Sequence, residues 1–196
     1  MGMDPGAGPD TLIAVGDTLV ARAIALGDAL RARGWRIATA ESCTGGLLAG
    51  ACTAPAGASD WFEAGFVTYG NEAKHGLIGV PEAMIRRHGA VSRHVADAMA
   101  RGALARAGVP LALSITGIAG PGGGSPAKPV GTVWLGLAWE QPRDPATGPL
   151  PVASWTERLQ LHGDRAAIRS QTVAHALDRL LAAARGEALP TSEPAP

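Results

Sequence analysis

The chain has few cysteines, no excess of charge of one sign and no long apolar run, and each absence excludes a class of protein. Its 196 residues include two cysteines, Cys43 and Cys52, too few for a disulfide framework or a structural zinc site. Lys+Arg and Asp+Glu number 17 each, so no basic footprint indicates nucleic-acid binding. No apolar run approaches the roughly 20 residues that span a bilayer. Residues 1–10 lack the features of a signal peptide, so we expect a cytoplasmic protein.

The five histidines show no spacing typical of metal ligands, and none follows a predicted strand as the base of a catalytic triad would. They are His75, His88, His94, His162 and His175. We interpret them as surface or internally hydrogen-bonded residues. We therefore expect chemistry that needs neither a metal nor another cofactor.

Hydrophobic periodicity predicts an alternation of helices and strands. Apolar residues recur every three or four positions from Thr11 onward, which predicts a helix that Gly34 ends. Further helices are predicted over residues 47–52, 71–77, 81–88, 92–107 and from 164 onward, and strands over residues 35–40, 61–69, 111–116, 131–139 and 154–161. This order predicts one α/β domain over residues 11–185, a three-layer α/β/α sandwich with a mixed central sheet. We expect a disordered leader over 1–10, a surface loop over 141–151 and a disordered tail over 186–196.

Three predicted strands end in polar or glycine-rich segments, after Ala40, Thr68 and Thr116. Ligands of such sheets bind at the carboxyl ends of the strands, so we expect these three ends to form a single site.

The segment after Ala40 places small and hydroxyl residues at a strand-to-helix turn. The N–H groups at the start of a helix attract negative charge, so those of residues 44–46 are candidates to stabilise an oxyanion. Ser42 is the candidate nucleophile. Alternatively, Ser42 or Thr44 merely caps the following helix. Cys43 is a rival nucleophile, because a helix N-terminus lowers the pKa of a thiol.

The segment after Thr68 offers a base for a serine. Lys74 lies about one helical turn beyond the strand end, and a lysine desolvated in a pocket can act as a general base. Serine–lysine pairs are a known variant of the catalytic triad. Tyr69 could orient the serine hydroxyl or pass on its proton. The alternative is a surface lysine beside a half-buried tyrosine.

The segment after Thr116 is rich in glycine up to Ser125 and reaches Lys128. Glycines let the backbone approach a ligand, and successive N–H groups can bind an anion. The segment is not a P-loop, since no Gly-Lys-Ser/Thr ends it, and it is not a dinucleotide-binding fingerprint. A nucleotide-binding loop and a purely structural loop both remain open.

Taken together, residues 40–46, 67–74, 114–123 and 128–133 resemble the CinA C-terminal-domain family, whose enzymes are nicotinamide-nucleotide amidohydrolases (NMN deamidases). The motifs match in order, and the resemblance extends from about Thr11 to Ala183. Longer members of the family carry an additional N-terminal domain, so this chain resembles the stand-alone form.

The resemblance implies metal-free hydrolysis of the carboxamide of nicotinamide mononucleotide, giving nicotinate mononucleotide and ammonia. It implies Ser42 as nucleophile, assisted by Tyr69 and Lys74, and Arg165 or Arg169 as the ligand of the phosphate. The substrate contacts that we expect are Glu41, Thr44, Gly45, Gly46, Asn71, Thr116, Gly117, Gly120, Gly122, Gly123 and Arg165.

Two other functions fit the same residues. One is a catalytically silent nucleotide-binding module, and the other is a serine amidase acting on another small amide. For every alternative we expect a small-molecule ligand, no nucleic acid and no membrane, and a homodimer.

Overall fold

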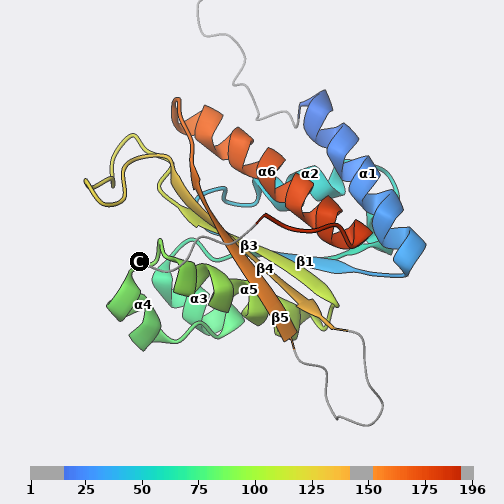
Figure 1. Ribbon diagram of the computed structural model, residues 1–196, viewed down its shortest axis with the longest axis horizontal. Coiled ribbons are helices and arrows are strands. Elements are labelled where there is room, and N and C mark those ends of the chain that lie inside the picture. The colour runs from blue at the N-terminus through green and yellow to red at the C-terminus, as the bar shows by residue number, and fades with distance from the viewer. Residues whose placement is uncertain (1–15, 142–151, 191–196) are drawn as a thin grey trace, which may run out of the picture.

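A five-stranded mixed sheet lies between two layers of helices in the computed structural model, which describes residues 16–141 and 152–190 (Figure 1). The strands are β1 (Ile37–Glu41), β2 (Phe62–Val67), β3 (Leu111–Gly117), β4 (Thr132–Glu140) and β5 (Val152–Gln160). Their order is β2-β1-β3-β4-β5; β1 runs parallel to β2 and β3, whereas β4 is antiparallel to β3 and β5. This architecture confirms the predicted three-layer sandwich with a mixed sheet, and it places β5 at an edge, in a hairpin with β4.

Each face of the sheet has its own helical layer and its own core. On one face lie α1 (Asp17–Arg33), α2 (Leu47–Thr53) and α6 (Arg165–Arg185), which pack on one another (Figure 1). On the other face lie α3 (Asn71–Ile78), α4 (Glu82–His88) and α5 (Arg93–Ala107). A short 3-10 helix, η1 (Ala58–Asp60), precedes β2. Two clusters of buried apolar side chains, one under each layer, supply the hydrophobic stabilisation of the fold.

Most helices end at the capping residues from which the sequence analysis predicted their ends. Gly34 ends α1 in the left-handed conformation, at φ 63°. The side chains of Ser92 and Asp164 accept hydrogen bonds from the backbone N–H groups three residues on, and so cap α5 and α6. Asn71 differs from the expectation: Gly70 occupies the cap position of α3, and Asn71 is the first helical residue.

Small residues bring α5 unusually close to the centre of the sheet. The Ser114 hydroxyl on β3 donates to the carbonyl oxygen of Ala96 on α5 at 2.6 Å. Gly136 on β4 faces the same carbonyl, and a methyl group there would overlap it. Because β3 is parallel to β1 and α5 runs back along it, the start of α5 lies at the edge where β1, β2 and β3 end.

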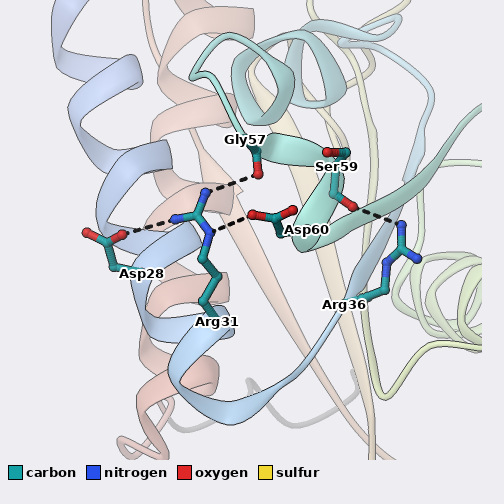
Figure 2. Close-up of polar contacts among 6 residues, drawn as sticks. All are labelled: Asp28, Arg31, Arg36, Gly57, Ser59 and Asp60. Carbon is teal, nitrogen blue, oxygen red and sulfur yellow. Dashed lines mark hydrogen bonds and ion pairs between the residues drawn. The ribbon is translucent and has the colours of Figure 1, made fainter.

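An arginine fastens α1 to the loop that leads into β2, at the opposite edge of the sheet. Arg31 donates to Asp28, to Asp60 and to the carbonyl oxygen of Gly57 at 3.0 Å, as Figure 2 shows. All these groups are solvent-exposed, so each ion pair contributes only about 0–1 kcal/mol. The contacts fix the loop mainly by geometry.

Residues 186–190, which we assigned to a tail, return to the sheet. The indole N–H of Trp155 donates to the carbonyl oxygen of Pro190 at 2.7 Å, and Leu189 packs against the core. The leader over 1–10, most of the loop over 141–151 and residues 191–196 lie outside the described residues. Within the described part of the chain, no helix is both long and apolar enough to cross a bilayer.

Two helical glycines allow a matched test of the close packing. A methyl group at Gly102 on α5 would overlap the carbonyl oxygen of Ile78, whereas one at Gly50 on α2 meets nothing within 4 Å. We expect Gly102→Ala to lower the free energy of unfolding by about 1–3 kcal/mol through overpacking. We expect Gly50→Ala to raise it by about 0.5–1 kcal/mol through better helix propensity. Urea denaturation of both variants measures this, and equal stabilities would contradict the packing described.

Candidate active site

Ser42 stands directly beyond the end of β1, where the backbone of residues 41–42 is hydrogen-bonded to the chain on both sides. Its N–H donates to the carbonyl oxygen of Ile115 on β3 at 3.0 Å. On the other side the N–H of Thr68 donates to the carbonyl oxygen of Glu41 at 2.8 Å. Both bonds continue the parallel ladder past the last strand residues. The serine turn is therefore held at the carboxyl edge of three parallel strands, as the sequence predicts.

The Glu41 carboxylate anchors this turn from below. It is 1% exposed and accepts three backbone hydrogen bonds, from the N–H groups of Gly46 (3.0 Å), Leu48 (3.0 Å) and Ala49 (2.8 Å). These are the orphan donors at the start of α2, so the carboxylate takes the place of a capping side chain. Glu41 was expected to contact the substrate; both its oxygens are instead occupied within the protein.

The same contacts change which N–H groups are available for an oxyanion. The N–H of Gly46 is used by Glu41, and that of Gly45 donates to the carbonyl oxygen of Ser42 at 3.1 Å. The expectation that these two donors serve an oxyanion is therefore wrong. Among the described residues, the N–H groups of Cys43 and Thr44 have no acceptor on any other residue. They are the donors that remain at this turn.

Lys74 is buried against the serine. It comes from α3, is 1% exposed, and its amine nitrogen Nζ lies 3.1 Å from Ser42 Oγ. The other contacts of Nζ are the carbonyl oxygens of Thr68 (2.8 Å) and Tyr69 (3.1 Å). No carboxylate of the described residues pairs with it. Burial lowers the pKa of Lys74 from its ordinary value, with a smaller opposing effect of Cys43.

These three neighbours suit a neutral amine. An uncharged lysine has two N–H donors and one lone pair, and the two carbonyl oxygens take the two donors. The lone pair then points toward Ser42 Oγ and can accept the hydroxyl proton. The arrangement can therefore convert the serine hydroxyl into a nucleophile, which is the requirement of covalent acyl transfer.

The backbone carbonyl of Tyr69 contacts the Lys74 amine, whereas its side chain contacts Arg165. Besides contacting Lys74, its carbonyl oxygen lies 3.5 Å from Ser42 Oγ. The side chain is 59% exposed, and its hydroxyl accepts from Arg165 Nη2 at 3.1 Å. Arg165 also donates through Nη1 to the carbonyl oxygen of Gly120 at 2.9 Å. The predicted assistance of the tyrosine hydroxyl stays a prediction, since its contact is with Arg165.

Cys43 has the opposite character from an activated thiol. Its side chain is 7% exposed and packs in the core beneath α2 and α6. Burial raises the pKa of the Cys43 thiol to about 11, and the nearby charge of Arg165 and Arg169 only partly opposes this. At neutral pH the thiol is protonated and faces away from solvent, which argues against the rival nucleophile.

Arg169 braces the serine turn from α6. Its Nη2 donates to the carbonyl oxygen of Thr44 at 2.8 Å, and its Nε is buried with no partner in the described structure. The Thr44 hydroxyl is likewise buried and unpartnered there. Of the two arginines considered for the phosphate, Arg165 is therefore the more exposed, and Arg169 the one engaged with the turn.

The Thr116 hydroxyl is satisfied within the fold. Its hydroxyl donates to the carbonyl oxygen of Ala90, before α5, at 2.9 Å. A buried hydroxyl with that acceptor has a structural role, and a substrate contact through it stays a prediction.

The glycine loop has two kinds of glycine. A methyl group at Gly117 or Gly120 would collide with the start of β4 or with Val130, so these positions need glycine for packing. At Gly122 a methyl group would meet nothing within 4 Å, and Gly123 has a φ of 85°. Of the four, only Gly122 and Gly123 are exposed to solvent.

The described residues contain no group of three His, Cys, Asp or Glu side chains placed to hold a metal ion. His75 contacts the carbonyl oxygen of Val80, and the rings of His88 and His94 stack at 3.8 Å.

The carbonyl oxygens of Thr68 and Tyr69 are functional groups that the sequence analysis missed. No side-chain motif marks a backbone acceptor. The available signal was indirect: a lysine buried without an acidic neighbour needs acceptors, and the end of the preceding strand is the place to find them.

Fold and geometry together define a class: an α/β protein with a serine–lysine pair at the carboxyl edge of its sheet, the set of groups that acyl-transfer hydrolases use. The chain belongs to the CinA C-terminal domain family, whose model matches residues 20–184. The nicotinamide-nucleotide amidohydrolase PncC of Pseudomonas putida is 51% identical over 146 residues, which are 74% of this chain and 84% of that protein.

Two other relatives extend the comparison. A competence-damage inducible protein of Symbiobacterium thermophilum is 54% identical over 145 residues, 74% of this chain, and the chain spans only 34% of that relative's length. The crystal structure of the competence/damage inducible protein CihA from Agrobacterium tumefaciens has a TM-score of 0.74 at 38% identity. That match covers 93% of this chain and 98% of the other.

The anchoring carboxylate gives a stability test. In Glu41→Gln the amide NH₂ group replaces one acceptor oxygen and faces a backbone donor, which leaves at least one buried N–H unpaired. We expect the free energy of unfolding to fall by about 2–3 kcal/mol. Glu63→Gln is the control: Glu63 pairs with Arg36 at a partly exposed site, so its loss should cost at most about 1 kcal/mol. Chemical denaturation compares the two, and an equal loss in both would refute the anchoring role.

Proposed function

We propose that this protein hydrolyses the carboxamide of nicotinamide mononucleotide to nicotinate mononucleotide and ammonia. The observation that carries the proposal is the contact of the buried Lys74 amine with Ser42 Oγ at 3.1 Å, without a carboxylate partner in the described structure. The substrate is supported by membership of the family and by the P. putida relative, which bears the name of this activity and is matched over 84% of its length.

In the first half-reaction Lys74 accepts the hydroxyl proton while Ser42 Oγ bonds to the amide carbon. The carbonyl oxygen becomes an oxyanion, and the N–H groups of Cys43 and Thr44 are the donors placed to stabilise it. One such donor typically contributes about 3–4 kcal/mol to the transition state. The two carbonyl oxygens that bind Lys74 hold its new positive charge in place.

The tetrahedral intermediate collapses when Lys74 returns its proton to the amide nitrogen. The C–N bond breaks, ammonia leaves, and Ser42 carries the nicotinoyl ester. A water molecule then gives a proton to Lys74 and attacks the ester carbon. Collapse of the second intermediate returns that proton to Ser42 Oγ, and nicotinate mononucleotide is released. Each proton taken up is given back, so the cycle needs no cofactor.

We place the phosphate of the substrate at Arg165. Its guanidinium is exposed at the mouth of the site and is held by two neutral acceptors, Gly120 O and the Tyr69 hydroxyl, which an anion can replace. Asn71, Gly122 and Gly123 are exposed and complete the proposed contacts.

We also propose a cytoplasmic homodimer. Both cysteines are free and buried, as in a reducing compartment. Large apolar side chains exposed at Ile24, Val67 and Leu77 offer surface that a second copy would cover.

The nucleophile is tested by Ser42→Ala, which removes the attacking oxygen. We expect ammonia release from nicotinamide mononucleotide to fall by at least about 10³-fold with the fold intact by circular dichroism. Cys43→Ala is the matched neighbour and should keep most of the activity. Full activity of Ser42→Ala, or a loss of activity only in Cys43→Ala, would refute the assignment of Ser42 as the nucleophile.

The same ammonia assay, run on a panel of pyridine and other small amides, separates the alternatives. Turnover of another amide in preference to the nucleotide favours a different serine amidase. Calorimetric binding of the nucleotide without ammonia from any amide favours a silent binding module.

The base is tested by pH dependence. Because only the neutral amine can accept a proton, kcat/KM should rise with pH through the pKa of Lys74, which burial moves below its ordinary value near 10.4. Lys74→Arg should be inactive at every pH, since a guanidinium stays protonated. Lys128→Arg, at the chain's other lysine, should keep the wild-type profile. A rising limb that survives in Lys74→Arg would rule out this base.

A further inference from the structure

A cavity of about 400 Å³ opens on the α5 face of the sheet, close to the start of α5. Its lining includes five basic side chains and one tryptophan: His88, Arg93, His94, Lys128, Trp134 and Arg158. We call it the basic pocket. None of the described residues that line it is acidic. A concave site with charge of one sign concentrates ligands of the opposite sign.

The two arginines of the basic pocket have no acidic partner among the described residues. Arg93 takes part in no ion pair, and the one hydrogen bond of Arg158 is a long one, 3.4 Å from Nη2 to the carbonyl oxygen of Ala127. Seven of the other described arginines pair with carboxylates: Arg22, Arg31, Arg36, Arg86, Arg101, Arg179 and Arg185. The donors of Arg93 and Arg158 are therefore available to a ligand.

The remaining basic groups are fixed in the wall. Lys128 Nζ donates to the carbonyl oxygens of Val91 (2.7 Å) and His88 (3.2 Å), which leaves one of its three donors. Burial and the positive charges of His94, Arg87 and Lys128 lower the pKa of His88, as expected where cations crowd together. The positive end of α5, a helix of 15 residues, adds to this potential.

The basic pocket is separate from the serine site. Across the sheet, Trp134 on β4 lies opposite Thr116, and Arg158 on β5 lies opposite Trp134. Ser42 stands two strands from Trp134 and three from Arg158, so strand spacing puts them roughly 10 and 14 Å away. The pocket shares its face of the sheet with α3, which carries Lys74, so distance along the sheet separates the two sites. Neither Ser42 nor Arg165 lines the pocket.

We propose that the basic pocket binds a phosphate monoester or free phosphate, gripped by Arg93 and Arg158, with Trp134 beside the group attached to the phosphorus. The planar guanidinium fork matches phosphate oxygens, and two forks with an ammonium match a dianion better than a monoanion. The volume exceeds what one phosphate fills, which leaves room for a ring along the indole. The proposal does not rest on the amidohydrolase activity.

Isothermal titration calorimetry at low ionic strength tests it, with inorganic phosphate and adenosine 5′-monophosphate as probes. The variant R93S/R158S removes both forks, and R106S/R185S removes two arginines at the far ends of α5 and α6 as a charge-matched control. We expect R93S/R158S to weaken binding roughly 100-fold, about 10-fold for each charge-assisted contact. R106S/R185S should bind as the wild type does, and R93K/R158K should recover part of the loss.

The two probes distinguish the source of the phosphate. Equal affinities indicate that free phosphate is the ligand. Tighter binding of the nucleotide, lost in Trp134→Leu, indicates a nucleoside monophosphate. Ammonia release by R93S/R158S and its urea midpoint should match the wild type, which separates this site from the serine site. No binding of either probe at millimolar concentration, or binding that R165S abolishes and R93S/R158S does not, overturns the proposal.

Discussion

The site depends on one constraint, the burial of the Lys74 amine among neutral acceptors. A buried amine must be hydrogen-bonded, and here two backbone carbonyls and the Ser42 hydroxyl do this. A carboxylate in the same place would hold the proton on nitrogen and remove the base. Neutral partners satisfy the amine while leaving its pKa low. The chain directly after β2 supplies both carbonyls. The geometry of this strand end therefore determines the chemistry of the amine.

The one carboxylate buried at the serine turn is kept away from that amine. Glu41 immediately precedes Ser42, yet its oxygens turn under the strand and bind three N–H groups of α2. The acid thus stabilises the turn without neutralising the lysine. Alternation along β1 explains how neighbours in the sequence reach opposite sides, since successive side chains of a strand point to opposite faces. The N–H groups at the start of α2 bind Glu41. The N–H groups that remain available precede this helix.

Much of this could be predicted from the sequence, because local patterns set it. Glycine and hydroxyl caps fixed helix ends at Gly34 and Ser92, and alternation of elements fixed the layers. The pairing of Ser42 with Lys74 followed from two strand ends that must meet in a parallel sheet. The directions of the side chains could not be predicted from these local patterns. The Thr116 hydroxyl turns to Ala90, and Cys43 turns into the core, because tertiary packing decides which side of a turn each residue faces. Backbone acceptors leave no mark in the sequence at all.

The anchoring of the serine turn by Glu41 also bears on how the protein loses activity when heated. Because one carboxylate joins the end of β1 to the first turn of α2, the turn cannot loosen on its own without releasing three buried N–H groups at once. Such a site belongs to the same cooperative unit as the core rather than to a separately melting loop. The serine turn therefore loses its geometry only when the core around it unfolds.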